Sequence, residues 1–205
     1  MDKTITKQRA ILTLFLLMVL LFCVSCTKKE RILDETAHDG LTVQIVGKDE
    51  VYGEALLLQK ETEENRIMMP EMEPWQVDFC NVDEGEVELA LGVHKVSPYH
   101  PVKTRRIFFY TIEDLRLVPK YRMSRLTYPF TDFRMMDIDE DGRDEILALE
   151  QMRDGSFVIG GYRWTNFGFE RVYASEEMVP EDFFAREQGK NLHLNGERIE
   201  WEEKK

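Results

Sequence analysis

Cysteine and long apolar runs are scarce in this sequence, and basic side chains are outnumbered by acidic ones. Its 205 residues include three cysteines, which is too few for a disulfide framework. Basic side chains number 27 against 39 acidic ones, giving a formal net charge of −12. This balance argues against a nucleic-acid partner, because phosphate recognition needs a basic face. Apolar residues still make up 43% of the chain, which is enough for a buried core in one large domain or two small ones.

The one long apolar run lies near the N-terminus. Residues 1–10 carry three basic side chains and one acidic side chain, and residues 11–24 are apolar except for Thr13. A basic segment followed by a short apolar segment is typical of a secretory signal. The run has 14 residues, whereas a helix that crosses a bilayer needs roughly 20.

The apolar run ends in Val24, Ser25 and Cys26. This end resembles the bacterial lipobox, in which small residues precede a cysteine that becomes N-terminal and lipidated. Ser25 fits the small position, although Cys23 stands where that family usually has leucine. The resemblance implies that Cys26 carries the lipid, with palmitate among its acyl groups. An uncleaved signal anchor is the alternative.

If Cys26 is lipidated, the domain boundaries and the cellular location of the chain follow. Residues 1–25 form a signal peptide, 26–40 a lipidated tether, and 41–205 a β-repeat domain. The protein is expected on the extracytoplasmic face of the cell membrane or outer membrane. Because the first 25 residues hold three basic side chains and one acidic one, the chain from Cys26 onward has a formal net charge of −14. Cys80 lies in an apolar-patterned stretch and is predicted to be buried and inert.

Beyond the tether, short runs of alternating apolar and polar residues predict strands. The clearest runs are 41–46, 55–58, 192–194 and 198–201. The last two flank Asn195-Gly196, a pair that favours a tight hairpin turn. A helix is predicted only over 180–188, because helical patterns are otherwise rare.

An internal repeat links two parts of the chain. Residues 75–91 match 131–149, and residues 110–121 match 162–173. Corresponding positions are 56 and 52 residues apart, close to the period of propeller blades at roughly 40–50. Repeat units are therefore predicted over about 74–128 and 129–175. The expected fold is all-β, a propeller-like array of about three to four antiparallel four-stranded sheets.

The second copy of the repeat contains an acidic loop. Asp137, Asp139 and Asp141 alternate with other residues, and Gly142 and Glu145 follow. Alternate carboxylates in a tight loop converge as Ca²⁺ requires. The twelfth place, where an EF-hand needs glutamate, is Ala148, so an EF-hand is rejected.

The loop and its flanking strands resemble the FG-GAP or VCBS repeat of integrin alpha chains and bacterial surface proteins. In that family a Ca²⁺ loop joins two strands of a propeller blade. The ligands that the resemblance implies are Asp137, Asp139, Asp141, the carbonyl of Arg143, and Glu145. The first copy lacks a residue matching Asp141 and is expected to keep the turn without the metal. The alternative for the second copy is a turn in which Asp side chains cap their own backbone.

These features predict a non-enzymatic binding or envelope-assembly module with a protein or glycan ligand. An extracytoplasmic glycan-active hydrolase and a purely structural lipoprotein are the alternatives. A loop over 93–106 is the favoured place for a partner contact. Core positions are favoured for Trp75, Trp164, Phe167 and Phe169.

Overall fold

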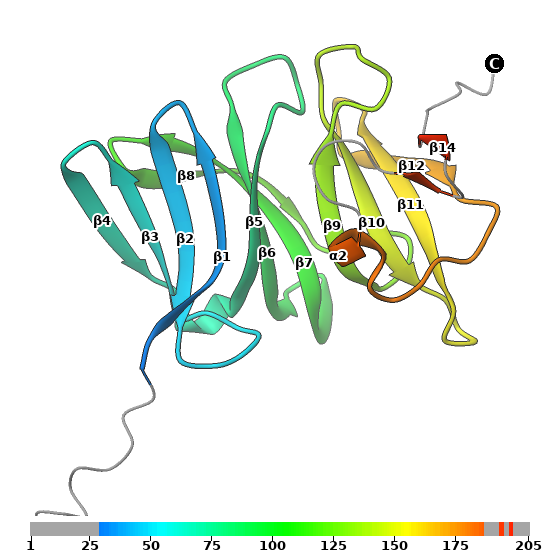
Figure 1. The fold of residues 1–205 in the computed structure, drawn as a ribbon, viewed down its shortest axis with the longest axis horizontal. Helices are drawn as coiled ribbons and strands as arrows, with labels where there is room; N and C mark the ends of the chain where they lie inside the picture. Colours follow the sequence, from blue (N-terminus) through cyan, green and yellow to red (C-terminus); the bar gives the residue numbers. More distant parts are fainter. Residues whose placement is uncertain (1–28, 187–192, 195–196, 199–205) are drawn as a thin grey trace, which may run out of the picture. The chain divides into compact units, whose positions relative to one another are not determined.

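The computed structural model describes residues 29–186, 193–194 and 197–198, and strands dominate this part of the chain (Figure 1). The first sheet contains β1 (Arg31–His38), β2 (Leu41–Gly47), β3 (Ala55–Lys60) and β4 (Glu63–Met68). The second sheet contains β5 (Pro74–Cys80), β6 (Glu88–Ser97), β7 (His100–Glu113) and β8 (Arg116–Met123). The third sheet contains β9 (Phe130–Met136), β10 (Glu145–Gln151), β11 (Phe157–Trp164) and β12 (Phe169–Ala174).

Every strand in these sheets pairs antiparallel with its neighbour in sequence. The all-β prediction with four-stranded antiparallel sheets is therefore confirmed for the described part of the chain. Short elements complete it: η1 (Pro70–Met72), α2 (Phe183–Arg186), β13 (His193–Leu194) and β14 (Glu197–Arg198). The predicted repeat units 74–128 and 129–175 contain the strands of the second and third sheets, respectively.

The sheets stack face to face, with the second sheet between the other two (Figure 1). The core between the first and second sheets includes Val43, Ile45, Leu56, Leu58, Leu89 and Leu91. The core between the second and third sheets includes Ala90, Ile107, Phe109, Phe133, Ile146 and Ala148. Because the second sheet has a core on each face, β6 reads as a continuous apolar run rather than an alternating one.

The first strands of the three sheets, β1, β5 and β9, lie side by side. A carboxylate oxygen of Asp34 on β1 accepts the backbone N–H of Val77 at 2.8 Å. A carboxylate oxygen of Asp78 on β5 likewise accepts the N–H of Met135 on β9 at 3.2 Å. Burial raises the pKa of Asp34, and it raises that of Asp78 to about 6. Half-buried carboxylates thus join each first strand to the next.

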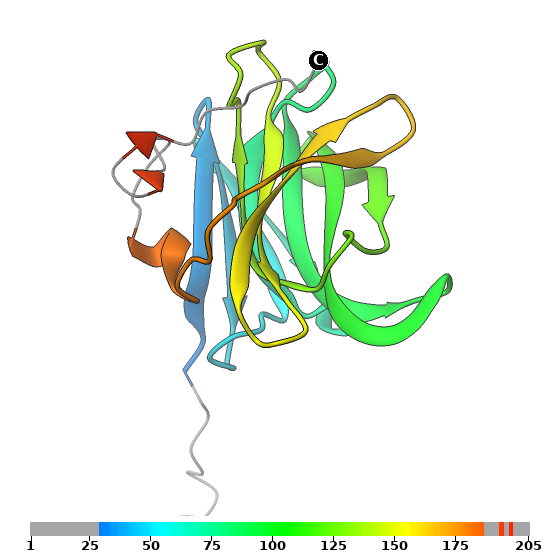
Figure 2. The same ribbon diagram turned by 90° about the vertical axis from the view of Figure 1, so that its right-hand side faces the viewer.

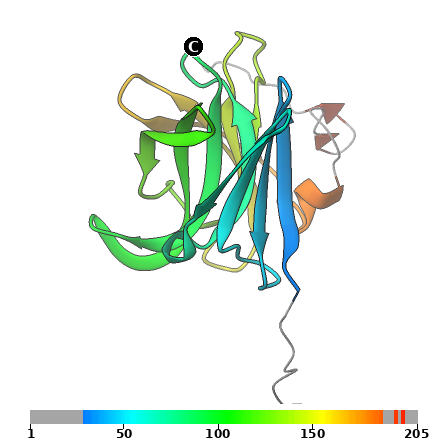
Figure 3. The same ribbon diagram turned by 90° about the vertical axis from the view of Figure 1, so that its left-hand side faces the viewer.

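The two outer faces of the stack differ. On the third sheet, Phe183 and Phe184 of α2 pack into an apolar cluster with residues of β9, β10 and β11, and Figure 2 shows α2 beside this sheet. The outer face of the first sheet, toward the viewer in Figure 3, carries polar pairs instead. Gln44 contacts Glu35 there, and the amide of Gln59 donates to Glu64 at 2.8 Å. Polar outer faces are typical of the terminal unit in a stacked array.

Two predicted irregular segments are strands. The tether was expected to reach residue 40, but β1 begins at Arg31, so this prediction is wrong for residues 31–38. Most side chains of β1 are exposed or half-buried, which removes the apolar alternation that marks a strand. The predicted loop over 93–106 is also wrong, because β6 and β7 continue as a paired ribbon to a turn at Pro98-Tyr99.

Three further predictions have separate outcomes. Phe167, expected in the core, is fully exposed in the β11–β12 turn. The helix predicted over 180–188 is α2 over 183–186, and residues 187–188 lie outside the described chain. Asn195-Gly196 also lies outside it, while β13 and β14 on either side pair antiparallel.

Replacing Phe184, which is 1% exposed, with Ala is expected to lower the free energy of unfolding by about 3–5 kcal/mol. The physical reason is the cavity left against the third sheet, together with the lost apolar burial. Urea denaturation measures the change, and Phe167→Ala is the matched control, expected to be neutral because Phe167 is exposed. Equal effects of the two substitutions would contradict the covering role of α2.

Candidate functional site

Two equivalent loops lie at the same end of the second and third sheets (Figure 1). Each joins the first strand of its sheet to the second strand, which begins with a buried glutamate. These glutamates are Glu88, with 0% exposed, and Glu145, with 1% exposed. Glu88 accepts the backbone N–H of Val82 at 3.2 Å, and Glu145 accepts that of Ile138 at 3.1 Å. The repeat seen in the sequence is therefore a repeated contact in the structure.

In the second sheet, a lysine from β8 closes the loop. The Nζ atom of Lys120 contacts Glu88 and lies 3.0 Å from a carboxylate oxygen of Asp83. The hydroxyl of Tyr121 donates to the other oxygen of Asp83 at 2.6 Å. These contacts lower the pKa of Asp83, whereas burial, together with the bond to Asp83, raises the pKa of Tyr121 to about 12. The loop's two inner carboxylates thus have a fixed internal cation.

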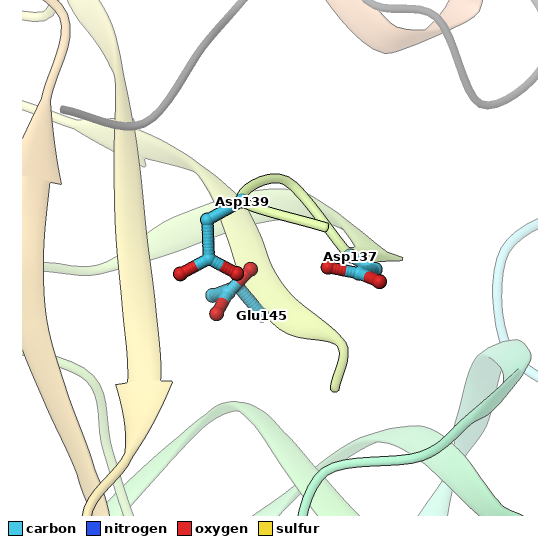
Figure 4. A group of neighbouring side chains, drawn as sticks. All are labelled: Asp137, Asp139 and Glu145. Carbon is cyan, nitrogen blue, oxygen red and sulfur yellow. The ribbon is translucent and has the colours of Figure 1, made fainter. Parts of the chain in front are cut away.

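In the third sheet, Arg163 from β11 takes the equivalent place. Its guanidinium contacts Asp139 and lies 3.3 Å from Glu145. The loop also brings Asp137 to these two acids, and one carboxylate oxygen from each of the three lies within 4.8 Å of the others (Figure 4). Burial raises the pKa of Glu145 to about 7. Two of the three gathered carboxylates therefore contact one guanidinium.

The other two predicted ligand residues form a pair of their own. The carboxylate of Asp141 accepts hydrogen bonds from the Arg143 guanidinium at 2.5 and 3.1 Å, and from the Arg143 N–H at 2.9 Å. These bonds lower the pKa of Asp141. Asp137 accepts the N–H groups of Asp141 and Gly142 at 3.1 and 2.9 Å. The structure thus gathers Asp137, Asp139 and Glu145, and it turns the Asp141 carboxylate toward Arg143.

The gathered acids have the donor chemistry of a hard-cation site. Ca²⁺ binds oxygen atoms, and carboxylates are its strongest protein ligands. In the second sheet the position of Asp137 is taken by Asn81, so that loop has one carboxylate fewer around its cation. The third-sheet cluster keeps negative charge after pairing with Arg163, and it fits a divalent cation better than its counterpart does.

The two loops are bonded to each other, which the sequence did not indicate. The N–H of Asn81 donates to the carboxylate of Asp144 at 2.7 Å, and the N–H of Asp144 donates to the carbonyl of Asn81 at 2.6 Å. The side-chain amide of Asn81 also donates to the carbonyl of Gly142 at 3.3 Å. A change in the conformation of one loop therefore affects the conformation of the other.

A second candidate site is a groove of about 320 Å³ over the first strands. It is lined by Leu33, Asp34, Trp75, Gln76, Arg105, Thr131, Asp132 and Arg134. Three buried polar atoms of these residues have no hydrogen-bond partner within the described chain: Trp75 Nε1, Gln76 Oε1 and Thr131 Oγ1. Buried polar atoms are usually paired, so three such atoms around one groove are notable.

The groove is mixed in charge. Burial raises the pKa of both Asp34 and Asp132, and Arg134 opposes this rise in each. The guanidinium of Arg105 lies over the ring of Trp75, 4.4 Å from its centroid. Carboxylates, guanidiniums and an indole N–H can together hydrogen-bond an uncharged polar ligand with many hydroxyl groups. Sequence reasoning missed this groove, since its residues come from four strands far apart in the chain.

Residues elsewhere in the core follow the sequence predictions more closely. Cys80 is buried and its pKa is raised by that burial, as expected of an inert thiol. Trp164 and Phe169 pack with Phe109 and Tyr121 between the second and third sheets, which confirms their predicted core positions.

One buried acid in the third sheet escaped the sequence reasoning. Glu150 is 0% exposed, lies 2.7 Å from Arg171 and accepts the hydroxyl of Tyr162. Its carboxylate occupies the space where a side chain at Gly160 would lie. The only signal in the sequence was the glycine pair at 160–161, which leaves room for a neighbouring side chain.

Comparisons of the chain with protein-family models, with curated proteins and with solved structures found no match. Among the described residues, no helix has the length and apolar character needed to cross a bilayer. The function is therefore inferred from the chemistry of the sequence and the geometry of these sites.

Replacing Lys120 with Met is expected to lower the free energy of unfolding by about 3 kcal/mol, because Glu88 then stays buried without its cation. Adding Glu88→Gln should recover part of this loss, since a glutamine side-chain oxygen can still accept the Val82 N–H. Chemical denaturation of the single and double variants measures both effects. Arg122→Met, at an exposed position of the same strand, is the control. Additive losses in the double variant would contradict the pairing.

Proposed function

We propose that this protein is a lipid-anchored, extracytoplasmic and non-enzymatic module that binds a ligand or assembles with other envelope components. The observation that carries the proposal is the groove over β1, β5 and β9. Its lining combines opposite charges with three buried polar atoms that lack partners. A polar ligand that enters the groove would meet the half-buried side chains of Arg105, Asp132 and Arg134, and this favours binding as the activity.

The anchor is proposed from the N-terminal sequence. The basic segment, the apolar run of 14 residues and the sequence Val24-Ser25-Cys26 favour cleavage before Cys26 and its acylation. The location that follows is the outer face of the cell membrane or the outer membrane. The partners proposed are therefore the membrane, through the lipid, and a glycan or protein ligand in the groove.

The three sheets are proposed to be blades of a propeller-like array of FG-GAP or VCBS type. Two features support this. The first strands lie side by side, as the innermost strands of blades do. The loops after β5 and β9 also repeat the same buried glutamate with the same backbone bond.

The loop after β9 is proposed to hold Ca²⁺ through Asp137, Asp139 and Glu145. When bound, the ion would supply positive charge that neutralises the clustered carboxylates and stiffens the loop. Within the chain, Arg163 already neutralises part of that charge, and the backbone N–H groups of Asp141 and Gly142 hold Asp137 in place. Arg143 keeps Asp141 out of the cluster, so the proposed set is smaller than the set that the resemblance implies.

A glycan-active hydrolase is the second candidate, and one observation favours it. Asp34, Asp78 and Asp132 all have raised pKa values near Arg134, and that of Asp78 reaches about 6. Raised carboxyl pKa values are common at acid–base sites. Each of these carboxylates, however, already accepts a backbone N–H, which favours a structural role for them.

A screen of the protein against a glycan array tests the proposed function. We expect the protein to bind members of a glycan array without hydrolysing them, and we expect Asp132→Asn to weaken that binding by changing the charge of the groove. Glu170→Gln on the exposed side of β12 is the control and should bind like the parent. Turnover of a bound glycan would establish the hydrolase instead. A loss of binding in both variants would place the ligand elsewhere.

Calcium is expected to raise the melting temperature, and Asp137→Asn should abolish the rise. The pKa of Glu145 lies above its ordinary value, so its protonated form stabilises the fold at low pH and this stabilisation is lost as the pH rises through about 7. Protons therefore compete with the cation, and the calcium effect should be larger at pH 8 than at pH 6. Thermal unfolding with added Ca²⁺ or chelator measures it, with Glu86→Gln in the matching loop as control.

Thermal unfolding with chelator, combined with the glycan-array screen, distinguishes the third candidate, a purely structural lipoprotein, from a binding module. In that case chelation lowers the melting temperature and the chain binds no ligand in the screen. No heat in calorimetry at millimolar Ca²⁺ would refute the metal proposal.

A further inference from the structure

A pocket beside the groove is basic, although the chain as a whole is acidic. It has a volume of about 160 Å³ and lies between β7 and the segment that joins β8 to β9. The residues that line it are His100, Thr104, Arg105, Arg125, Leu126, Thr127, Tyr128, Pro129 and Phe130. None of them is acidic, and residues 89–112, which form most of β6 and β7, contain no acidic side chain either. A cleft lined by charges of one sign attracts ions of the other, so this pocket suits an anionic group.

The guanidinium of Arg125 is free to contact a ligand in this pocket. Arg125 is exposed, and its side chain makes no hydrogen bond, ion pair or ring contact with another residue of the described chain. By contrast, Arg143, Arg163 and Arg171 each pair with a carboxylate of the protein. A guanidinium binds a carboxylate or a phosphate through two parallel hydrogen bonds. Arg125 can therefore supply the direct contact to an anion.

A second positive charge lies behind the wall of the pocket. Arg106 is 0% exposed, and its guanidinium donates to the backbone carbonyls of Lys95, His100 and Val102 at 2.8–3.0 Å. No carboxylate of the described chain pairs with it, and its Nη1 atom has no hydrogen-bond partner there. Buried charges are usually paired with an opposite charge. The uncompensated charge of Arg106 thus adds to the attraction for an anion in the adjoining pocket.

His100 connects this buried arginine to the pocket. Its Nδ1 atom lies 3.4 Å from Nη2 of Arg106, and His100 is one of the residues that line the pocket. Because a guanidinium only donates hydrogen bonds, Nδ1 accepts, and the neutral imidazole carries its proton on Nε2. This Nε2 atom has no partner in the part of the chain that the structure describes. The pocket therefore has an imidazole N–H donor besides its guanidiniums and the hydroxyl groups of Thr104 and Thr127.

Arg105 joins the pocket to the groove over β1, β5 and β9. It lines both of them, and its guanidinium donates to the carbonyl of Thr131 and lies over the ring of Trp75, two residues of the groove. The acids of the groove, Asp34 and Asp132, do not line the pocket. A ligand that extends across Arg105 therefore meets a surface of mixed charge on one side and a pocket whose only charged residues are basic on the other.

The volume of the pocket limits the group that can enter it. About 160 Å³ corresponds to roughly five water molecules at about 30 Å³ each. That space takes a carboxylate or a phosphate with the atoms next to it, and the rest of a larger ligand lies outside. An acidic peptide would bring further carboxylates close to Asp34 and Asp132, whereas a sugar can carry one charged substituent among uncharged hydroxyl groups. The combination of pocket and groove therefore favours a glycan.

We propose that the ligand of the groove is an acidic glycan, and that its carboxylate or phosphate group enters this basic pocket. Arg125 and Arg105 bind the anionic group, and the hydroxyl groups of the sugar lie in the groove beside Asp132 and Arg134. This inference rests on the proposed function, which places a ligand in the groove. It adds the charge of that ligand and the residue that selects for the charge, Arg125.

The test is a titration of the full-length protein with matched sets of oligosaccharides. Each set has a neutral member, a member in which one sugar is a uronic acid, and a member that carries one phosphate; an acidic peptide is titrated in parallel. We expect an acidic member to bind at least about tenfold more tightly than the neutral one, because hydrogen bonds to a charged group are the stronger ones. This preference should decrease as the salt concentration rises. The member that shows it identifies the anion as carboxylate or phosphate.

A substitution makes the result specific to the pocket. Arg125→Gln is expected to remove the preference, so that acidic and neutral members of a set bind alike. Arg153→Gln is the matched control and should keep the preference, because Arg153 is also exposed and unpaired within the described chain but does not line the pocket. Modification by the arginine reagent phenylglyoxal, followed by mass spectrometry, gives a direct readout. A bound acidic oligosaccharide should protect Arg125 and leave Arg153 reactive.

The outcomes separate this inference from the proposed function. Equal affinity for neutral and acidic members refutes the inference and leaves a glycan-binding groove intact. A preference that persists in Arg125→Gln also refutes it, because the anion then binds elsewhere. Tighter binding of the acidic peptide than of any acidic oligosaccharide overturns the glycan as the class of ligand. If no oligosaccharide binds, the glycan ligand of the proposed function is refuted together with this inference.

Discussion

Carboxylates that the fold removes wholly or partly from solvent impose the strongest constraint on this structure. A buried carboxylate is stable only when donors or cations compensate for its lost hydration. Asp34 and Asp78 meet this need with backbone N–H groups of the next sheet, which joins the first strands. Glu88, Glu145 and Glu150 meet it with basic side chains from later strands of their own sheets. The stacking of the sheets, the loop geometry and the groove all depend on these pairings.

The sequence predicts those strands whose side chains pack on a neighbouring sheet, and it misses strands whose side chains stay exposed. Strands such as β2 and β3 were evident because one face of each is apolar and packs on a neighbouring sheet. The repeat was evident because two sheets use the same loop. The sequence did not predict β1, because β1 is an edge strand whose side chains are largely exposed. Local pattern carries no signal when a strand depends on backbone pairing alone.

The candidate sites show the same limit. The acidic loop is a continuous segment, so its carboxylates could be found by spacing, and three of the five predicted residues do gather. The Asp141 carboxylate instead pairs with Arg143, two residues further along the chain. This pairing competes with a ligand role for Asp141, and the spacing of the acids does not predict it. Arg163 comes from a strand far along the chain. The groove is built wholly from such distant residues, and only the fold brings them together.

A comparison of the two equivalent loops explains why the metal site is proposed for only one of them. Both contain a buried glutamate and an aspartate bridged by a basic side chain. In the second sheet Lys120 faces two carboxylates, and Asn81 adds no charge. In the third sheet Asp137 adds a third carboxylate beside Asp139 and Glu145. In both loops an internal cation thus compensates a buried glutamate and an aspartate, and the extra acid is why the proposed metal site lies in the third sheet. The loop with this extra acid is hydrogen-bonded to its neighbour through Asn81, so an ion bound to one would stiffen both.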